Sequence, residues 1–145
     1  MTREIEFRGF DGTKWYYGDL EYNRKTGVAR IHTYKEDGGY DRQHPVDPDT
    51  VGQFTGLVDK NGVKIFEGDV VRRKESAFGL EDTGVAKYDC NLGAFVLEYE
   101  SYGETLQSTF DKEFSNEDGR YTIEGTYSYE VIGNVHDNSE LLSTK

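Results

Sequence analysis

The feature that most constrains the fold of this chain is the segment Val46–Arg73, VDPDTVGQFTGLVDKNGVKIFEGDVVRR, which we call the signature segment. Glycine and asparagine turn signals interrupt its short β-prone runs every few residues. Asn61-Gly62 is typical of a tight hairpin turn, and Gly68-Asp69 precedes a branched run. The segment therefore predicts short strands joined by tight turns.

Other parts of the chain also have the sequence pattern of β-strands. Apolar and polar residues alternate with a period of two in Glu4–Arg8, Gly27–Tyr34 and Ala94–Tyr99. Short runs of branched and aromatic residues lie between turn residues in Trp15–Tyr17, Val70–Arg72, Val85–Tyr88 and Tyr129–Val135. With 17 glycines in the chain, we predict a mainly β fold of antiparallel sheets, arranged as a small barrel or sandwich.

Helix signals are few, and we expect at most one or two short helices. Leu106, Phe110 and Phe114 recur at a helical spacing, and Ser139–Leu142 has the pattern of one helical turn. The segment Lys35–Pro48 carries both prolines of the chain and is predicted to be a long polar loop, because proline biases the preceding residue away from helix. A second polar stretch, SNEDGR at residues 115–120, is predicted to be a turn.

Two pairs of similar segments follow one another in the same order, which indicates an internal duplication. Asp11–Leu20 matches Asn61–Val70 at an offset of 50 residues, and Thr26–Ile31 matches Thr83–Tyr88 at an offset of 57. The alternative is convergence, because β-hairpins share a small set of turn sequences.

Under the duplication hypothesis the chain is a single domain with two related hairpin units, residues 1–60 and 61–140, and the polar loop 35–48 joins them. Each unit would contain a hairpin that opens at a Gly-Asp pair. Asp19 and Asp69 would then begin equivalent strands.

The charge of the chain bears on its partners. The formal net charge is −11, from 28 acidic and 17 basic residues, and residues 74–145 contain 15 of the acidic but only 5 of the basic ones. Nucleic-acid binding is therefore not expected, because phosphate recognition requires clustered Lys and Arg. The acidic surface either serves solubility, binds a basic partner protein or mimics the charge of a nucleic acid.

The sequence also predicts a cytoplasmic protein without a membrane partner. The longest apolar run, Ala94–Leu97, has four residues, far fewer than the roughly 20 that span a bilayer. The N-terminal residues alternate charged with apolar side chains and lack the apolar core of a secretory signal. Cys90 is the only cysteine, so no intrachain disulfide is expected.

No metal or cofactor site is expected from the sequence. The three histidines, His32, His44 and His136, form no zinc-binding motif. The run that begins at Asp59 is similar to the start of a calcium-binding loop, but its twelfth position is Val70 instead of an acidic residue. We interpret this run as a turn.

Glu67 and Asp69 are the one pair of carboxylates that suggests catalysis. With a single glycine between them, they would lie on one side of an extended chain, as acid-base or magnesium chemistry requires. The simpler interpretation is that Asp69 accepts backbone hydrogen bonds at a strand start and Glu67 is solvated. We expect no catalytic residue and a protein that is not an enzyme.

Two basic and aromatic runs suggest an alternative function. Lys14–Tyr17 and Tyr22–Lys25 interleave cations with rings, a composition that suits a stacking platform for single-stranded nucleic acid on a small barrel. Alternation within a strand would direct about half of these rings into the core. The net charge of −11 also opposes this interpretation.

The signature segment resembles that of the YopX family of bacteriophage and prophage proteins. The opening REIEFRGFDGTKWYYG is similar to the N-terminal stretch of that family, and VIGNVHDNSELL, Val131–Leu142, is similar to its C-terminal stretch. The resemblance spans nearly the whole chain, except residues 100–125. It implies a small, mainly β protein of a phage or integrated element, without an activity or active site that the family would assign.

The leading hypothesis is therefore a non-enzymatic phage-type accessory protein in the cytoplasm of a bacterial host. It would bind a protein partner from host or phage, with a nucleic-acid-associated small β-barrel as the alternative and an enzyme that uses Glu67 and Asp69 as the third. Short β units also leave edges through which the chain would self-associate. We assign the polar and glycine positions of the family-like stretches to the fold: Gly56, Asp59, Asn61, Gly62, Gly68, Asp69, Gly133 and Asn134.

Overall fold

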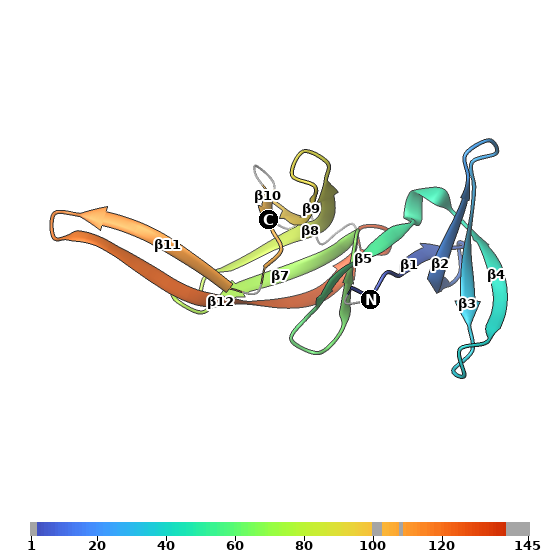
Figure 1. Cartoon of the computed structure of the whole chain (residues 1–145), viewed down its shortest axis with the longest axis horizontal. Coiled ribbons are helices and arrows are strands. Elements are labelled where there is room, and N and C mark those ends of the chain that lie inside the picture. Colours follow the sequence, from blue (N-terminus) through green and yellow to red (C-terminus); the bar gives the residue numbers. More distant parts are fainter. Residues whose placement is uncertain (1–2, 100–102, 108, 139–145) are drawn as a thin grey trace. The chain divides into compact units, whose positions relative to one another are not determined.

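The protein is mainly β, as predicted (Figure 1). A computed structural model describes residues 3–99, 103–107 and 109–138. Within these ranges it contains twelve strands and one helical element, the 3-10 helix η1 (Pro48–Thr50). The strands form two antiparallel sheets, and neither sheet closes into a barrel in the described part of the chain. The barrel alternative of the fold prediction is therefore wrong.

The first sheet has the strand order β4-β3-β2-β1-β5-β6. Its strands are β1 (Phe7–Phe10), β2 (Trp15–Asn23), β3 (Val28–Tyr34), β4 (Tyr40–Val46), β5 (Gly52–Val58) and β6 (Lys64–Phe66). The second sheet has the order β10-β9-β8-β7-β12-β11. Its strands are β7 (Asp69–Glu75), β8 (Glu81–Asp89), β9 (Ala94–Glu98), β10 (Gly103–Thr105), β11 (Thr109–Asn116) and β12 (Gly119–Asn134).

The chain divides into two compact units. The first contains the residues up to Leu57 together with Lys64–Gly68, and the second contains Val58–Val63 together with the residues from Asp69 onward. The chain thus passes from one unit to the other three times within the signature segment. Neither unit coincides with residues 1–60 or 61–140, and the duplication remains a prediction.

The matched segments adopt different structures beyond their first turn. Asp19 lies within β2, whereas Asp69 begins β7. Gly68 has a φ of 89° in the turn before β7, a conformation that side chains with a Cβ rarely adopt. Gly18 is instead inside β2, where an added Cβ would lie 1.9 Å from the carbonyl oxygen of His32. The two Gly-Asp pairs therefore do not begin equivalent strands, and this expectation of the duplication hypothesis is wrong.

The core of the first unit lies on one face of β2, β3 and β4. Ala29, Ile31 and Val46 are buried there, and Phe7, Tyr16, Leu20 and Val51 pack against them. Ala29 and Val46 are register partners, as are Leu20 and Ile31. Because side chains alternate along a strand, the residues between these core positions point to the opposite face of the sheet.

The core of the second unit surrounds β7, a central strand of its sheet. Its fully buried apolar side chains come from three adjacent strands: Val70, Val71, Ala86 and Leu97. Arg73 is also buried, with its guanidinium 4.3 Å from the ring centroid of Tyr127 and 5.2 Å from that of Tyr99.

Two carboxylates compensate the buried charge of Arg73. Arg73 Nη2 lies 3.0 Å from Asp82 Oδ2, and Nη1 donates to Glu104. Burial lowers the pKa of Arg73, but the hydrogen bonds to Glu104 and Asp82 outweigh burial, so the pKa is raised above its usual value. The sequence pattern gave no indication of this buried ion pair.

Two predictions of irregular or helical structure are wrong. The predicted loop 35–48 contains β4. Because β4 is an edge strand, Pro45 does not have to donate a backbone N–H to a further strand. Phe110 and Phe114 lie in β11, which pairs with β12 along its whole length, and Leu106 precedes this strand. An interval of four residues fits the period of a strand as well as that of a helix.

Two other expectations concern the C-terminal part of the chain. Asn116 and Gly119 are register partners across the turn that joins β11 and β12, so the turn prediction for residues 115–120 is confirmed. Gly119–Thr126 pairs with β11, while Tyr127–Asn134 pairs with β7, and the hairpin extends past the end of β7 (Figure 1). The helical turn expected at Ser139–Leu142 lies outside the described residues.

Candidate functional site

The signature residue Asp59 is a buried structural acceptor. Asp59 Oδ1 accepts hydrogen bonds from the backbone N–H groups of Asn61 at 2.8 Å and Val63 at 2.9 Å, and Oδ2 accepts one from Val131 at 3.0 Å. Burial raises the pKa of Asp59, but these three donors and the nearby charge of Lys60 outweigh burial and lower the pKa. Asp59 therefore joins the hairpin turn to β12, and the turn interpretation of this run is confirmed.

The other positions assigned to the fold lie in turns or at irregularities. Gly56 and Gly62 have φ values of 91° and 80°. Gly133 follows a register shift in the pairing of β12 with β7. Asn134 accepts hydrogen bonds from the N–H groups of His136 and Asp137. These geometries agree with a structural role for these positions, which remains a prediction.

Glu67 and Asp69 have different surroundings and belong to different units. Glu67 Oε1 accepts a hydrogen bond from the N–H of Gln53 at 2.8 Å, and its carbonyl oxygen accepts one from buried Arg8. Asp69 is 2% exposed at the start of β7. The carboxylate of Glu67 thus has a backbone partner, although the sequence suggested that it is solvated.

The histidines are not gathered into one site. His44 stacks on Tyr16 with ring centroids 3.7 Å apart and is hydrogen-bonded to Thr33, whereas His32 lies on the opposite face of the sheet. His136 is exposed in the turn after β12. Among the described residues, no group of three or more His, Cys, Asp or Glu side chains is arranged to hold a metal ion.

The basic and aromatic runs do not form one platform. Tyr16 packs against the core, with the Lys14 ammonium 5.5 Å from its ring centroid. Trp15 instead contacts Phe10, at a centroid distance of 5.1 Å, and the guanidinium of Arg8. The expected alternation therefore divides the rings between the two faces of β2.

The face of β2, β3 and β4 opposite the core carries aromatic and charged side chains that are exposed or half-buried. We call it the tyrosine face and define it by Tyr17, Asp19, Glu21, Arg30, His32, Tyr34 and Tyr40. Register pairs join these strands: Asp19 lies opposite His32, Glu21 opposite Arg30, and Tyr34 opposite Tyr40. Residues from three adjacent strands thus form one continuous surface.

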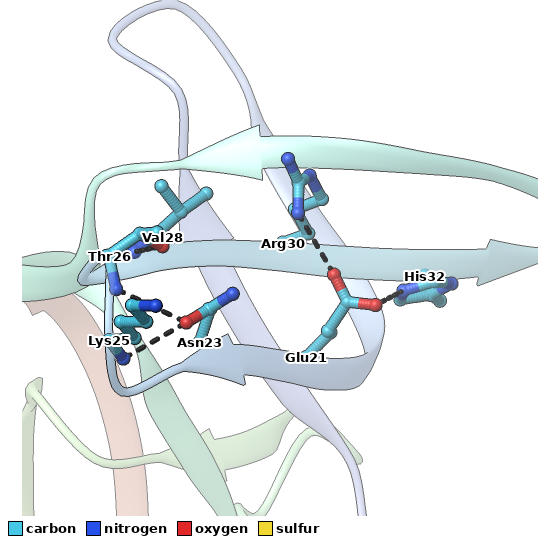
Figure 2. Close-up of polar contacts among 7 residues, drawn as sticks. All are labelled: Glu21, Asn23, Lys25, Thr26, Val28, Arg30 and His32. Atoms are coloured by element: carbon cyan, nitrogen blue, oxygen red, sulfur yellow. Dashed lines mark hydrogen bonds and ion pairs between the residues drawn. The ribbon is translucent and has the colours of Figure 1, made fainter.

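Glu21 pairs with two neighbours on this face (Figure 2). Its Oε2 lies 3.1 Å from Arg30 Nη1, and its Oε1 lies 3.6 Å from His32 Nε2. The side chains of Glu21 and Arg30 remain 49% and 36% exposed. This carboxylate is therefore already compensated by charge within the protein.

Asp19 and the tyrosines form the adjoining part of the face. The hydroxyl of Tyr34 donates to Asp19 Oδ2 at 2.8 Å, and this hydrogen bond raises the pKa of Tyr34. The ring of Tyr40 lies 6.0 Å from that of Tyr34, edge to face at 77°, and 5.8 Å from that of His32. The rings and the carboxylate are held in one network.

Side-chain to backbone hydrogen bonds stabilise the turn between β2 and β3, the hairpin that supports the face. Asn23 Oδ1 accepts hydrogen bonds from the N–H groups of Lys25 and Thr26, and Thr26 Oγ1 accepts one from Val28 (Figure 2). The opposite side of β2 and β3 packs against the core through Leu20 and Ile31. The tyrosine face therefore lies on a regular, packed scaffold, which suits non-covalent recognition.

The tyrosine face was not found in the sequence because its third strand was predicted to be a loop. Tyr34 ended a predicted strand, but Tyr40 was assigned to the segment Lys35–Pro48. A signal was present in the turn residues Asp37 to Gly39, after which the chain returns as β4.

Comparison with protein families agrees with the resemblance of the sequence. The family described as YopX protein matches residues 6–143. The chain belongs to the YopX family. No curated protein matches it.

The YopX match includes both the signature segment and the tyrosine face. It thus confirms the recognition that rested on the signature segment and the two flanking stretches. In the part of this YopX chain that the structure describes, no helix is long and apolar enough to cross a membrane.

Proposed function

We propose that this YopX-family protein is a non-enzymatic accessory protein that binds a partner protein through its tyrosine face, in the cytoplasm of a bacterium that carries the phage or prophage. The observation that supports this most is the exposure of its tyrosines. Tyr17, Tyr34 and Tyr40 are 46%, 50% and 53% exposed on one sheet face. The family match is consistent with an accessory protein.

Tyrosine is well suited to this role. It supplies a large contact area with few rotatable bonds and keeps a polar hydroxyl for hydrogen bonding. Aromatic residues are also enriched in protein interfaces relative to the rest of the surface. A partner that covers these rings would therefore gain contact area at a small cost in side-chain entropy.

The charges of the face favour a protein partner over nucleic acid. Arg30, its exposed cation, is already paired with Glu21 at 3.1 Å. Asp19 adds a negative charge beside the rings. A phosphate backbone would meet no uncompensated cation here, whereas nucleic-acid binding normally depends on such cations.

The proposal is tested by placing a photo-crosslinking amino acid at Tyr40 and irradiating host cells that carry the phage or prophage. The matched control has the same amino acid at Tyr88, which is 46% exposed on β8 of the second unit. We expect a discrete crosslinked protein from position 40 only, and its loss when Tyr34→Ala is added. No crosslink from position 40, or the same product from both positions, would overturn the proposal.

A further inference from the structure

One carboxylate of the tyrosine face is not compensated by a cation. Glu21 lies beside Arg30 and His32, but Asp19 has the hydroxyl of Tyr34 as its partner, with no cation at ion-pair distance among the described residues. The Tyr34 hydrogen bond engages Oδ2 at 2.8 Å and holds the carboxylate beside the ring. Asp19 itself is exposed.

Aromatic rings lie next to this carboxylate. Tyr34 and Tyr40 are each about half exposed, and their edge-to-face arrangement directs the two ring planes at 77° to one another. The negative face of an aromatic ring attracts cations, most often the planar guanidinium of arginine. A carboxylate beside such a ring adds a charged hydrogen-bond acceptor.

We infer that the tyrosine face binds an arginine side chain of its partner, with the guanidinium stacked on Tyr34 or Tyr40 and donating to Asp19. This inference rests on the proposed function and specifies the chemistry of the partner. The formal net charge of −11 gives the protein a general attraction for a basic partner. Asp19 and the two rings supply the local complementarity that the general charge lacks.

Arginine fits this arrangement better than other cations. A metal ion would find one carboxylate, because Glu21 is engaged by Arg30 and His32. A lysine ammonium offers a point charge, whereas guanidinium combines a flat stacking surface with several donors in one plane. The geometry of a ring beside a carboxylate uses both properties of guanidinium.

The test is an NMR titration of the full chain with N-acetyl-arginine methylamide as the probe, observed at the ring resonances of Tyr34 and Tyr40. N-acetyl-citrulline methylamide is the control, because it keeps the planar group and removes the charge. We expect saturable shifts of both rings with the arginine probe and about tenfold weaker binding of the citrulline and lysine analogues.

Two charge-removing variants distinguish a site from general attraction. Asp19→Asn should weaken the arginine probe about tenfold, while Glu117→Gln, at an exposed position in the turn of the second unit, should leave the affinity unchanged. Tyr34→Phe, which keeps the ring, should retain part of the binding. No ring shift, equal binding of the citrulline or lysine analogue, or equal loss in both charge variants would overturn the inference.

The outcome is separable from that of the proposed function. Crosslinking from position 40 reports whether a protein docks on the face, whatever its chemistry. A crosslink that depends on Tyr34, together with no binding of the arginine probe, would remove the inference and leave the proposed function intact. No crosslink from position 40 in the protein that keeps Tyr34 would remove the proposed function itself.

Discussion

Two aspartates show how differently this chain uses the same side chain. Asp59 is 6% exposed, and its carboxylate accepts hydrogen bonds from three backbone N–H groups. Asp19 is exposed on the tyrosine face and accepts a hydrogen bond from the hydroxyl of Tyr34. The first carboxylate organises the backbone, whereas the second is available at a surface.

The difference separates the family signature from the candidate site. The signature segment contains Asp59 and glycines with positive φ at positions 56, 62 and 68, so its residues are restricted by backbone geometry. All the residues that define the tyrosine face lie in β2, β3 and β4, outside that segment. We therefore expect substitutions in the signature turn to reduce stability, and substitutions in the tyrosine face to reduce binding without unfolding the protein.

The largest expected effect is that of Asp59→Ala, which removes a buried carboxylate that accepts from three backbone N–H groups. A hydrogen bond to a charged group contributes about 1.5–3 kcal/mol, so we expect a loss of about 4 kcal/mol in the free energy of unfolding. Urea denaturation measures it. Asp19→Ala is the matched control and should leave the midpoint unchanged; equal losses would erase the distinction between the two aspartates.

The same turn predicts a dependence of stability on acid. Because the pKa of Asp59 is lowered in the folded protein, its contribution is complete above the usual aspartate pKa of about 4 and is lost as the pH falls through the lowered value. The difference in unfolding free energy between wild type and Asp59→Asn should therefore narrow below about pH 4. A constant difference from pH 6 to pH 2.5 would contradict this account.

The next effect compares a buried arginine with an exposed one. Arg73→Leu leaves Asp82 and Glu104 without their common cation and should cost about 3 kcal/mol. Arg30→Leu removes an exposed pair with Glu21 and should cost less than about 1 kcal/mol. Thermal and urea unfolding of both variants measure the two losses in the free energy of unfolding. A larger loss for Arg30→Leu would mean that the tyrosine face supports the fold.

Gly68→Ala should have a smaller effect on stability. The φ of 89° at Gly68 is unfavourable for a residue with a Cβ, and we expect a loss of about 1–2 kcal/mol in the free energy of unfolding. The comparison is Gly68→Asn, because asparagine tolerates positive φ better than alanine. If both variants match the wild type in urea denaturation, the positive φ at this turn does not restrict which residue the signature segment can have there.

The smallest effect is a change in titration without a change in fold. Donation to Asp19 raises the pKa of Tyr34, so Asp19→Asn should lower that pKa toward the usual tyrosine value of about 10. A pH titration of ring resonances measures the shift, and Tyr34→Phe identifies the signal. An unchanged pKa would mean that the Tyr34–Asp19 hydrogen bond does not persist in solution.

Local sequence predicted much of the strand content. The alternation in Gly27–Tyr34 and Ala94–Tyr99 corresponds to β3 and β9, because a half-exposed strand needs period-two polarity. The turn at Asn61-Gly62 was also evident, since such dipeptides adopt tight turns with positive φ. These features depend on residues that are close in sequence.

The remaining features depend on pairing between distant residues. Pro45 suggested a loop because proline lacks the backbone N–H that a strand inside a sheet donates. β4 is an edge strand, where that N–H is not required. Whether a sheet closes depends on its last strands, which local patterns do not identify. To predict the tyrosine face, one must know the register of β3 with β4. This register includes a shift between Thr33 and Tyr34 that sets Tyr34 opposite Tyr40.

The most direct test of the central claim uses one variant that carries both Tyr34→Ala and Tyr40→Ala, compared with Asp59→Ala in the same partner-capture assay. Capture is measured with the purified partner protein that crosslinking identified. The temperature is one at which wild type and both variants are folded by circular dichroism. We predict that the double variant keeps the wild-type unfolding midpoint and loses capture, while Asp59→Ala has a lowered midpoint and keeps capture when folded. Full capture by a folded double variant would contradict the account.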